Sequence, residues 1–425
     1  MLFHQRLVPV AFVVLAGAGV PKSSQAEEWT NIDGRALTAD LISADATDAT
    51  LKMADGKTYT IKLNTLSEES QARVKAFVAE KDKATSKPAK ESTEGSQRRS
   101  GRPAPSPDDK LNWDDEWPVD ASADDNEVVA VKEDAEKGEF IYHSPHYEFV
   151  CDARLGTIVV RRFARLFEST LEYCKLLPIS MQKPHNVGDR TERLRIELFK
   201  SKSDYAKAGG PPGSAGVYIG GRDVILVPLE SLGVVASGKG FTLDYDKGNK
   251  TLPHEITHQL TDRWYYATGA RGWFTEGLAE YIGTTPYNSG GGTFRIRTNR
   301  KALVEYVTAY GEDRNGGRAL GKEIHMTPLR QWMLQSYSSF LDDAGKNYGV
   351  GALVAYYFFH MDEDGDRVAI TNFLKALREG KEGEAALEAL RNGRTWDELS
   401  DAITKGWRSK GVKLTWAPDP GESGA

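Results

Sequence analysis

The chain is poor in cysteine, and the two cysteines that it has are placed too far apart to form a disulfide. Cys151 and Cys174 are the only thiols in 425 residues. Cys151 ends a predicted strand, and Cys174 lies near the far end of a helix predicted to begin around Gly156. That helix would separate the two residues by about 25 Å, far beyond bridging distance. We therefore expect two buried free thiols, although an exported protein would be permitted a disulfide.

The chain also lacks an excess of positive charge and a long hydrophobic run. Its net charge is −6, which argues against nucleic-acid binding by the whole chain. The apolar stretch 7–20 is too short and too poorly flanked to read as a membrane-spanning helix. Residues 1–26 instead have the pattern of a signal peptide, with His4 and Arg6 before the apolar stretch and small residues at its end. No cysteine follows there to carry a lipid, so we expect an exported protein, periplasmic or secreted; an uncleaved anchor stays open.

What the chain does contain is an H-E-x-x-H motif, formed by His254, Glu255 and His258. A match by chance is expected only about 0.01 times, which favours a metal site over a helix that merely contains two histidines. On a helix His254 and His258 project from one face, and two neutral imidazoles supply half of a tetrahedral zinc site. Glu255 is turned by about 100° around the helix axis, so it misses the metal and can reach a metal-bound water as a general base. Glu276, in the next predicted helix, is the candidate third ligand.

These two predicted helices, with H-E-I-T-H in one and W-F-T-E-G-L-A-E-Y in the other, resemble the gluzincin metallopeptidases, which include thermolysin and the zinc aminopeptidases. At fold level the resemblance covers residues 140–410. It implies a zincin-like α+β fold with a mixed sheet, the motif helix and a C-terminal helical half. It also implies that Zn2+ binds to His254, His258 and Glu276. In thermolysin-like members an acidic residue at the position of Glu280 orients the first zinc histidine; a solvated surface carboxylate is the alternative here.

Two further site predictions depend on this resemblance. In the family an edge strand before the motif helix binds the extended substrate, and here that strand is the first half of a predicted hairpin with a glycine turn. Its candidate residues are Gly216, Val217, Tyr218 and Ile219, although the same stretch also fits a core strand. The stretch K-N-Y-G-V-G-A-L resembles a segment of the zinc aminopeptidases in which a tyrosine hydroxyl stabilises the oxyanion. That role falls on Tyr348, for which a position in the core is the alternative.

The remaining sequence divides by composition. In residues 27–80, apolar and polar residues alternate around two Asp-Gly dipeptides, as in half-buried strands joined by tight turns. The patterns W-T-x-x-D-G-R and D-G-K-x-Y-x-I-x-L there resemble the Sla-homology domain, a small SH3-like barrel, which we expect to bind a partner or act as a spacer. The predicted parts are a signal peptide 1–26, an all-β barrel 27–80, a disordered charged linker 81–138, a catalytic core 139–290 and a helical subdomain 291–418. Part of the linker, around Trp117, is expected to pack on the core, and the glycine-rich stretch 284–298 predicts a flexible rim loop.

Together these features predict an exported, zinc-dependent metallopeptidase that hydrolyses a peptide or protein substrate. The G-x-M-E-N stretch with which zinc aminopeptidases hold a free amine does not occur before His254, so we expect an endopeptidase. Two other functions stay open, a non-catalytic envelope adaptor that binds partners through the barrel and a zinc hydrolase of a non-peptide amide. Glu255 argues against the adaptor, because a purely structural zinc site does not need that carboxylate. No nucleic-acid partner is expected, and no membrane span after signal cleavage.

Overall fold

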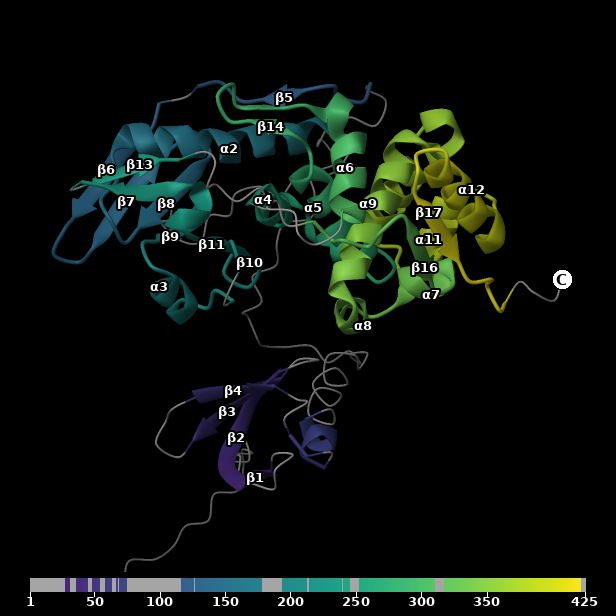
Figure 1. The fold of residues 1–425 in the computed structure, drawn as a ribbon, viewed down its shortest axis with the longest axis horizontal. Helices are drawn as coiled ribbons and strands as arrows, with labels where there is room; N and C mark the ends of the chain where they lie inside the picture. The colour runs from purple at the N-terminus through teal and green to yellow at the C-terminus, as the bar shows by residue number, and fades with distance from the viewer. Residues whose placement is uncertain are drawn as a thin grey trace, which may run out of the picture. The chain divides into compact units, whose positions relative to one another are not determined.

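The chain divides into two compact units, Met1–Arg98 and Arg99–Ala425 (Figure 1). The predicted signal peptide and most of the predicted linker lie outside the described residues. Over the part of the chain that is described, no helix is both long and apolar enough to cross a membrane. The computed structural model describes residues 27–30, 36–44, 48–53, 58–62, 66–67, 69–74, 116–125, 127–177, 193–211, 214–238, 240–244, 252–309 and 317–421.

The first unit is an antiparallel four-stranded sheet with a short helix over residues 69–74. Trp29 is buried in its core, and its indole N–H donates to the Ala39 carbonyl at 3.0 Å. The predicted alternating strands are therefore confirmed. The described strands form an open sheet and no closed barrel is found among them, so the barrel itself stays a prediction. These strands are β1 (Glu27–Thr30), β2 (Ala36–Ala44), β3 (Asp48–Met53) and β4 (Thr58–Lys62).

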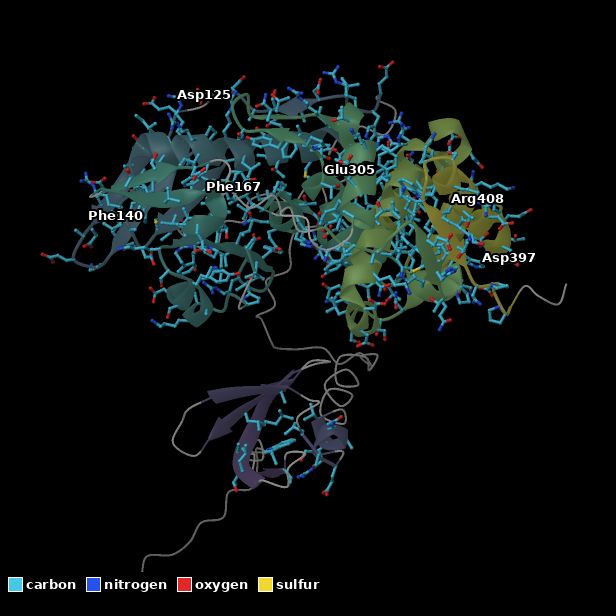
Figure 2. All side chains as sticks on the ribbon, viewed as in Figure 1. Asp125, Phe140, Phe167, Glu305, Asp397 and Arg408 are labelled. Carbon is cyan, nitrogen blue, oxygen red and sulfur yellow. The ribbon has the colours of Figure 1, made fainter. Side chains whose placement is uncertain are left out.

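The second unit is built on a six-stranded mixed sheet with the order β10-β11-β9-β8-β7-β6. Strands β8, β9 and β11 are parallel, while β6, β7 and β10 pair antiparallel with their neighbours. Alternation along β8 buries Tyr147 and Phe149 against Phe167 of the helix α2 (Thr157–Leu176). Phe167 is labelled in Figure 2. The strands are β6 (Val129–Asp134), β7 (Glu139–His143), β8 (Tyr147–Cys151), β9 (Leu194–Phe199), β10 (Val217–Ile219) and β11 (Val224–Pro228).

Helices surround this sheet and continue into the C-terminal half, which makes the unit an α+β structure, as predicted. The helices α4 (Leu252–Leu260) and α5 (Trp273–Gly283) lie between the sheet and the C-terminal helices in Figure 1. The other helices are α2 (Thr157–Leu176), α3 (Lys202–Lys207), α6 (Asn299–Thr308), α7 (Leu329–Leu334), α8 (Tyr337–Asp342), α9 (Ala344–His360), α10 (Val368–Arg378), α11 (Glu384–Arg391) and α12 (Trp396–Arg408). Short 3₁₀ helices are η2 (Leu229–Leu232), η3 (Arg263–Tyr266), η4 (Ile296–Thr298) and η5 (Asp362–Gly365). Three small sheets contain β12 (Val234–Ser237) with β13 (Gly240–Leu243), β5 (Ala121–Ser122) with β14 (Tyr287–Asn288) and β15 (Thr293–Phe294), and β16 (Glu323–Met326) with β17 (Lys413–Trp416).

The predicted linker 81–138 is wrong in its second half, because β5 and β6 both lie within it. Strand β6 is an edge strand, and a strand with one open side keeps its charged residues in solvent while its backbone pairs with β7. A high content of acidic residues therefore did not exclude sheet structure here. Trp117 packs against the hydrophobic core of the second unit, as expected, and its indole N–H donates to the Tyr281 hydroxyl at 3.1 Å. The core thus begins before residue 139.

The predicted rim loop 284–298 is also different in the structure. It forms the hairpin β14–β15, which pairs with β5. The Ser169 hydroxyl of α2 donates to the Gly292 carbonyl at 2.7 Å, and the Phe294 side chain is fully buried. The glycines of this stretch therefore form a turn that is held against α2. Glycine content alone did not distinguish a tight, anchored hairpin from a flexible loop.

The two cysteines are free and buried, as predicted. Cys151 ends β8, and Cys174 lies in the last turns of α2. Burial raises the pKa of each thiol to about 12. Since the thiolate is the reactive form of cysteine, neither residue is suited to nucleophilic or metal chemistry.

The helices α5 and α9 cross at two glycines, and this contact holds the motif region against the C-terminal half. A Cβ atom added at Gly277 of α5 would lie 2.4 Å from the Gly351 carbonyl oxygen of α9. We predict that Gly277→Ala lowers the free energy of unfolding by about 1–3 kcal/mol, because the two helix backbones would have to separate. Urea denaturation monitored by circular dichroism, in the presence of a chelator, measures this change.

Gly345→Ala is the matched control for this prediction. Gly345 also lies in α9, but a Cβ atom there meets nothing within 4 Å. Alanine at an open helical position should raise stability by about 0.5–1 kcal/mol. Equal stability of the two variants would show that the close approach of α5 and α9 does not depend on Gly277.

Candidate metal centre

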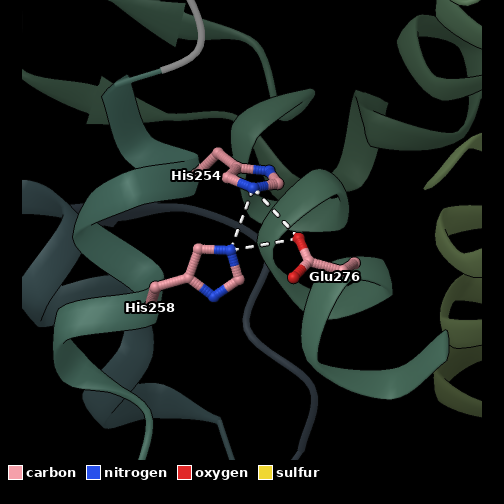
Figure 3. Close-up of side chains that lie close together, drawn as sticks. All are labelled: His254, His258 and Glu276. Atoms are coloured by element: carbon pink, nitrogen blue, oxygen red, sulfur yellow. Dashed lines mark hydrogen bonds and ion pairs between the residues drawn. The ribbon is translucent and has the colours of Figure 1, made fainter. Parts of the chain in front are cut away.

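His254, His258 and Glu276 bring three ligand atoms together between α4 and α5 (Figure 3). The two histidines are one turn apart on α4, and their Nε2 atoms are 3.0 Å apart. The Glu276 Oε2 atom of α5 lies 3.1 Å from the His258 Nε2 atom and 3.3 Å from the His254 Nε2 atom. The spacing of the motif thus becomes a nearly equilateral triangle of donors, as the sequence predicted.

The triangle has the dimensions that a tetrahedral zinc ion requires. Ligand atoms at zinc–ligand bond lengths and tetrahedral angles lie about 3.3 Å from one another. The observed separations of 3.0 to 3.3 Å agree with this value. Two imidazoles and one carboxylate are also the ligand set of several catalytic zinc sites. The residues present therefore fit a zinc ion.

A hydrogen-bond partner fixes the orientation of each candidate ligand. The His254 Nδ1 atom lies 3.3 Å from the Glu280 Oε1 atom, which leaves the lone pair on the Nε2 atom. The Tyr266 hydroxyl donates to the His258 backbone carbonyl and lies 3.3 Å from the His258 Nδ1 atom, whose N–H it accepts. The Tyr337 hydroxyl donates to the second carboxylate oxygen of Glu276 at 2.8 Å. All three partners direct electron-rich atoms into the triangle.

The electrostatics of the centre favour a positive charge inside the triangle. Burial alone would lower the pKa of His254, but hydrogen bonds with Glu276 and Glu280 outweigh it and hold this pKa well above its usual value. Burial would likewise raise the pKa of Glu276, yet His258 and His254 hold it well below its usual range. The group is thus arranged to bind a cation.

Glu280 is buried, and it forms an ion pair with Arg318. The carboxylates of Glu255, Glu276 and Glu280 with the guanidinium of Arg318 sum to −3 + 1 = −2 charges. A divalent cation in the triangle would neutralise these four groups. Glu280 is therefore neither a solvated surface residue nor a direct member of the triangle, and its position agrees with the predicted orienting role.

The carboxylate of Glu255 is hydrogen-bonded to the edge of the six-stranded sheet. Its Oε2 atom accepts a hydrogen bond from the Tyr218 backbone N–H at 3.0 Å. It lies on the same helix as the two histidines but is not part of the ligand cluster, as the helical geometry predicted. Its half-buried carboxylate is thus placed beside the metal position rather than in it.

The candidate substrate strand is at the edge of the six-stranded sheet. Val217, Tyr218 and Ile219 form β10, which stands first in the strand order and pairs only with β11 on the described sheet. The alternative of a core strand does not agree with this edge position and with the half-buried side chains of all three residues. Gly216 precedes β10, where a Cβ atom would lie 3.2 Å from the Leu226 carbonyl oxygen. Whether this edge binds substrate stays a prediction.

Tyr348 lies beside the metal triangle, on α9. Its ring centroid is 6.0 Å from that of His254, and the Arg318 guanidinium lies 4.8 Å from the Tyr348 ring. Burial raises the pKa of Tyr348, so its half-buried hydroxyl stays a neutral hydrogen-bond donor. The residue is placed near the centre, and its catalytic role stays a prediction.

Three residues of the centre were not found by sequence reasoning, namely Tyr266, Tyr337 and Arg318. Tyr266 lies only eight residues after His258, in the short connection between the two site helices, and this proximity was an available signal. Tyr337 and Arg318 lie 61 and 38 residues from the carboxylates that they bind, and no local pattern connects them.

Comparisons of the chain with protein-family models, with curated proteins and with solved structures found no match. The gluzincin and Sla-homology resemblances therefore stay predictions.

Proposed function

We propose that this chain is a zinc-dependent metallopeptidase of the gluzincin type. The observation that carries the proposal is the triangle of His254, His258 and Glu276, with the carboxylate of Glu255 beside it on the same helix. A purely structural zinc site closes all four positions with protein ligands. The described cluster has three ligands and an adjacent carboxylate, which supports a catalytic site with an open position.

The residues around the triangle have separable tasks in peptide hydrolysis. A zinc ion held by these three ligands would act as a Lewis acid on the peptide carbonyl and would lower the pKa of a water molecule bound to it. Glu255 accepts the proton of the attacking water and passes it to the leaving amine. Tyr348, as a neutral donor, stabilises the negative charge that develops on the carbonyl oxygen.

The edge of β10 is the proposed binding site for the peptide backbone. The backbone N–H of Tyr218 donates to Glu255, so it lies on the side of β10 that does not pair with β11. The N–H and C=O of one strand residue point to the same side, so the Tyr218 carbonyl also faces outward. An extended peptide can pair with this edge largely independently of its sequence. This mode supports endopeptidase action.

We also propose that the protein is exported and that the first unit is a Sla-homology, SH3-like domain that binds a partner. The signal-peptide pattern in residues 1–26 supports export. The antiparallel sheet β1–β4 with Trp29 in its core supports a small β domain. The second unit is proposed to have the zincin fold, for which the mixed sheet and the pair α4–α5 are the support.

Metal content and casein hydrolysis, measured together on the purified chain, test the peptidase function. We expect one zinc per chain and hydrolysis that a chelator abolishes and added zinc restores. One zinc without casein hydrolysis would favour the adaptor, or an amide hydrolase if small non-peptide amides are cleaved. A chain that binds no zinc would refute the metal centre.

A further inference from the structure

Arg271 is a positive charge close to the metal centre that forms no ion pair among the described residues. It is exposed in the turn before α5, next to the N-cap residue Gly272. Among the described residues its guanidinium makes no ion pair and no hydrogen bond, and its one contact is with an aromatic ring. The other guanidinium close to the ligands, Arg318, forms an ion pair with Glu280. Within the part of the chain that the structure describes, no carboxylate forms an ion pair with Arg271.

Its contacts place Arg271 beside the candidate ligands. The guanidinium carbon lies 4.5 Å from the ring centroid of Tyr337, whose hydroxyl donates to Glu276 at 2.8 Å. These two contacts place the Arg271 guanidinium within the length of about three extended residues of the Glu276 carboxylate.

The contact with Tyr337 leaves the guanidinium able to bind a ligand. A guanidinium held over an aromatic face by a cation–π interaction keeps the N–H donors at its edge free. Those donors form a planar fork that matches the two oxygens of a carboxylate. Tyr337 therefore acts as a platform that orients Arg271 while its charge remains available.

We propose that Arg271 binds a carboxylate of the peptide substrate within about three residues of the cleaved bond, an inference that rests on the proposed peptidase function. Arg318 and a bound zinc ion would together neutralise the carboxylates of Glu255, Glu276 and Glu280. The charge of Arg271 then remains to attract a carboxylate of the peptide. The carboxylate belongs either to an Asp or Glu side chain or to the C-terminus of a short peptide.

Equilibrium binding tests this assignment without requiring cleavage. Fluorescence anisotropy measures the binding of four labelled peptides to the zinc-loaded Glu255→Gln chain. The peptides carry Glu or Gln at one central position, and each of these two forms has either a free or an amidated C-terminus. Adding Arg271→Gln should weaken binding of the carboxylate-bearing peptides about tenfold and leave the neutral peptide unchanged. Arg271→Lys should restore part of the affinity, since it keeps the charge without the planar fork.

Arg263→Gln is the matched control. Arg263 is also exposed, and its guanidinium lies 4.5 Å from the ring centroid of Trp264. Arg263 lies before Arg271 in the connection between α4 and α5, and none of its described contacts is with a candidate ligand. Its replacement should therefore leave the binding of all four peptides unchanged. Zinc content and thermal unfolding of both variants verify that the fold is retained.

The responding peptide identifies the source of the carboxylate. An effect on the Glu peptide with an amidated C-terminus assigns the side chain, and an effect confined to free C-termini assigns the terminal carboxylate. If Arg271→Gln changes no affinity, or if the parent chain binds no peptide, the proposal is overturned. Because binding is measured on a chain designed not to cleave, a failure of casein hydrolysis in the native chain would count against the peptidase function alone.

Discussion

Glu255→Gln is expected to reduce peptide hydrolysis roughly 10³-fold while zinc content stays at one ion per chain. The glutamine amide has the shape of the carboxylate but cannot accept the proton of the attacking water. Its carbonyl oxygen can still accept the Tyr218 N–H, so the contact between α4 and β10 is preserved. Hydrolysis of casein at matched zinc content, with thermal unfolding as a check of the fold, measures the effect.

Glu305→Gln is the control for the loss of one negative charge. Glu305 is exposed on α6 and contacts Lys301 at the helix surface (Figure 2). This variant should hydrolyse casein as the native chain does. Unchanged hydrolysis by Glu255→Gln would refute its role as general base, and hydrolysis lost together with zinc would show instead that Glu255 supports the metal site.

The part of the centre that is local in sequence could be predicted. His254, Glu255 and His258 share one helix, so the helical period alone fixes their relative directions. Glu280 follows Glu276 by one turn and lies beside the Nδ1 atom of His254, whose Nε2 atom faces Glu276. The residues that complete the centre come from elements whose packing no period describes. Tyr337 lies on α8 and Arg318 precedes β16, and both reach carboxylates of α5 that are distant in the sequence.

The same distinction separates the predicted from the missed elements of the fold. The hairpin β10–β11 depends on neighbouring residues, and it was predicted. The parallel pair β16–β17 joins segments about 90 residues apart, and α12 packs against β17. Strand β6 was not predicted because its many charged residues indicated a linker, although charged residues are common on an edge strand. Pairing between strands that are far apart in the sequence, such as β16 and β17, leaves no signal in a local sequence pattern.

His258→Ala is expected to lower the affinity for zinc more than about 100-fold. Loss of an outer hydrogen-bond partner alone costs about 10–100-fold, and this substitution removes a ligand from a set of three. Zinc that binds only the folded chain stabilises it by about 2.7 kcal/mol at a hundredfold excess over its dissociation constant. The native chain should gain this stability when zinc is added, and His258→Ala should not. Competition with a chelating dye and thermal unfolding measure the two effects.

Two further variants make this test specific. Tyr266→Phe removes the hydroxyl that faces the His258 Nδ1 atom but keeps all three ligands, so its zinc affinity should fall between those of the native chain and of His258→Ala. His325→Ala removes an exposed histidine of β16 that contacts Thr415, and it should bind zinc as the native chain does. The graded order of native chain, Tyr266→Phe and His258→Ala follows only if zinc is held in the triangle. Equal affinity of all four chains would place the bound zinc elsewhere.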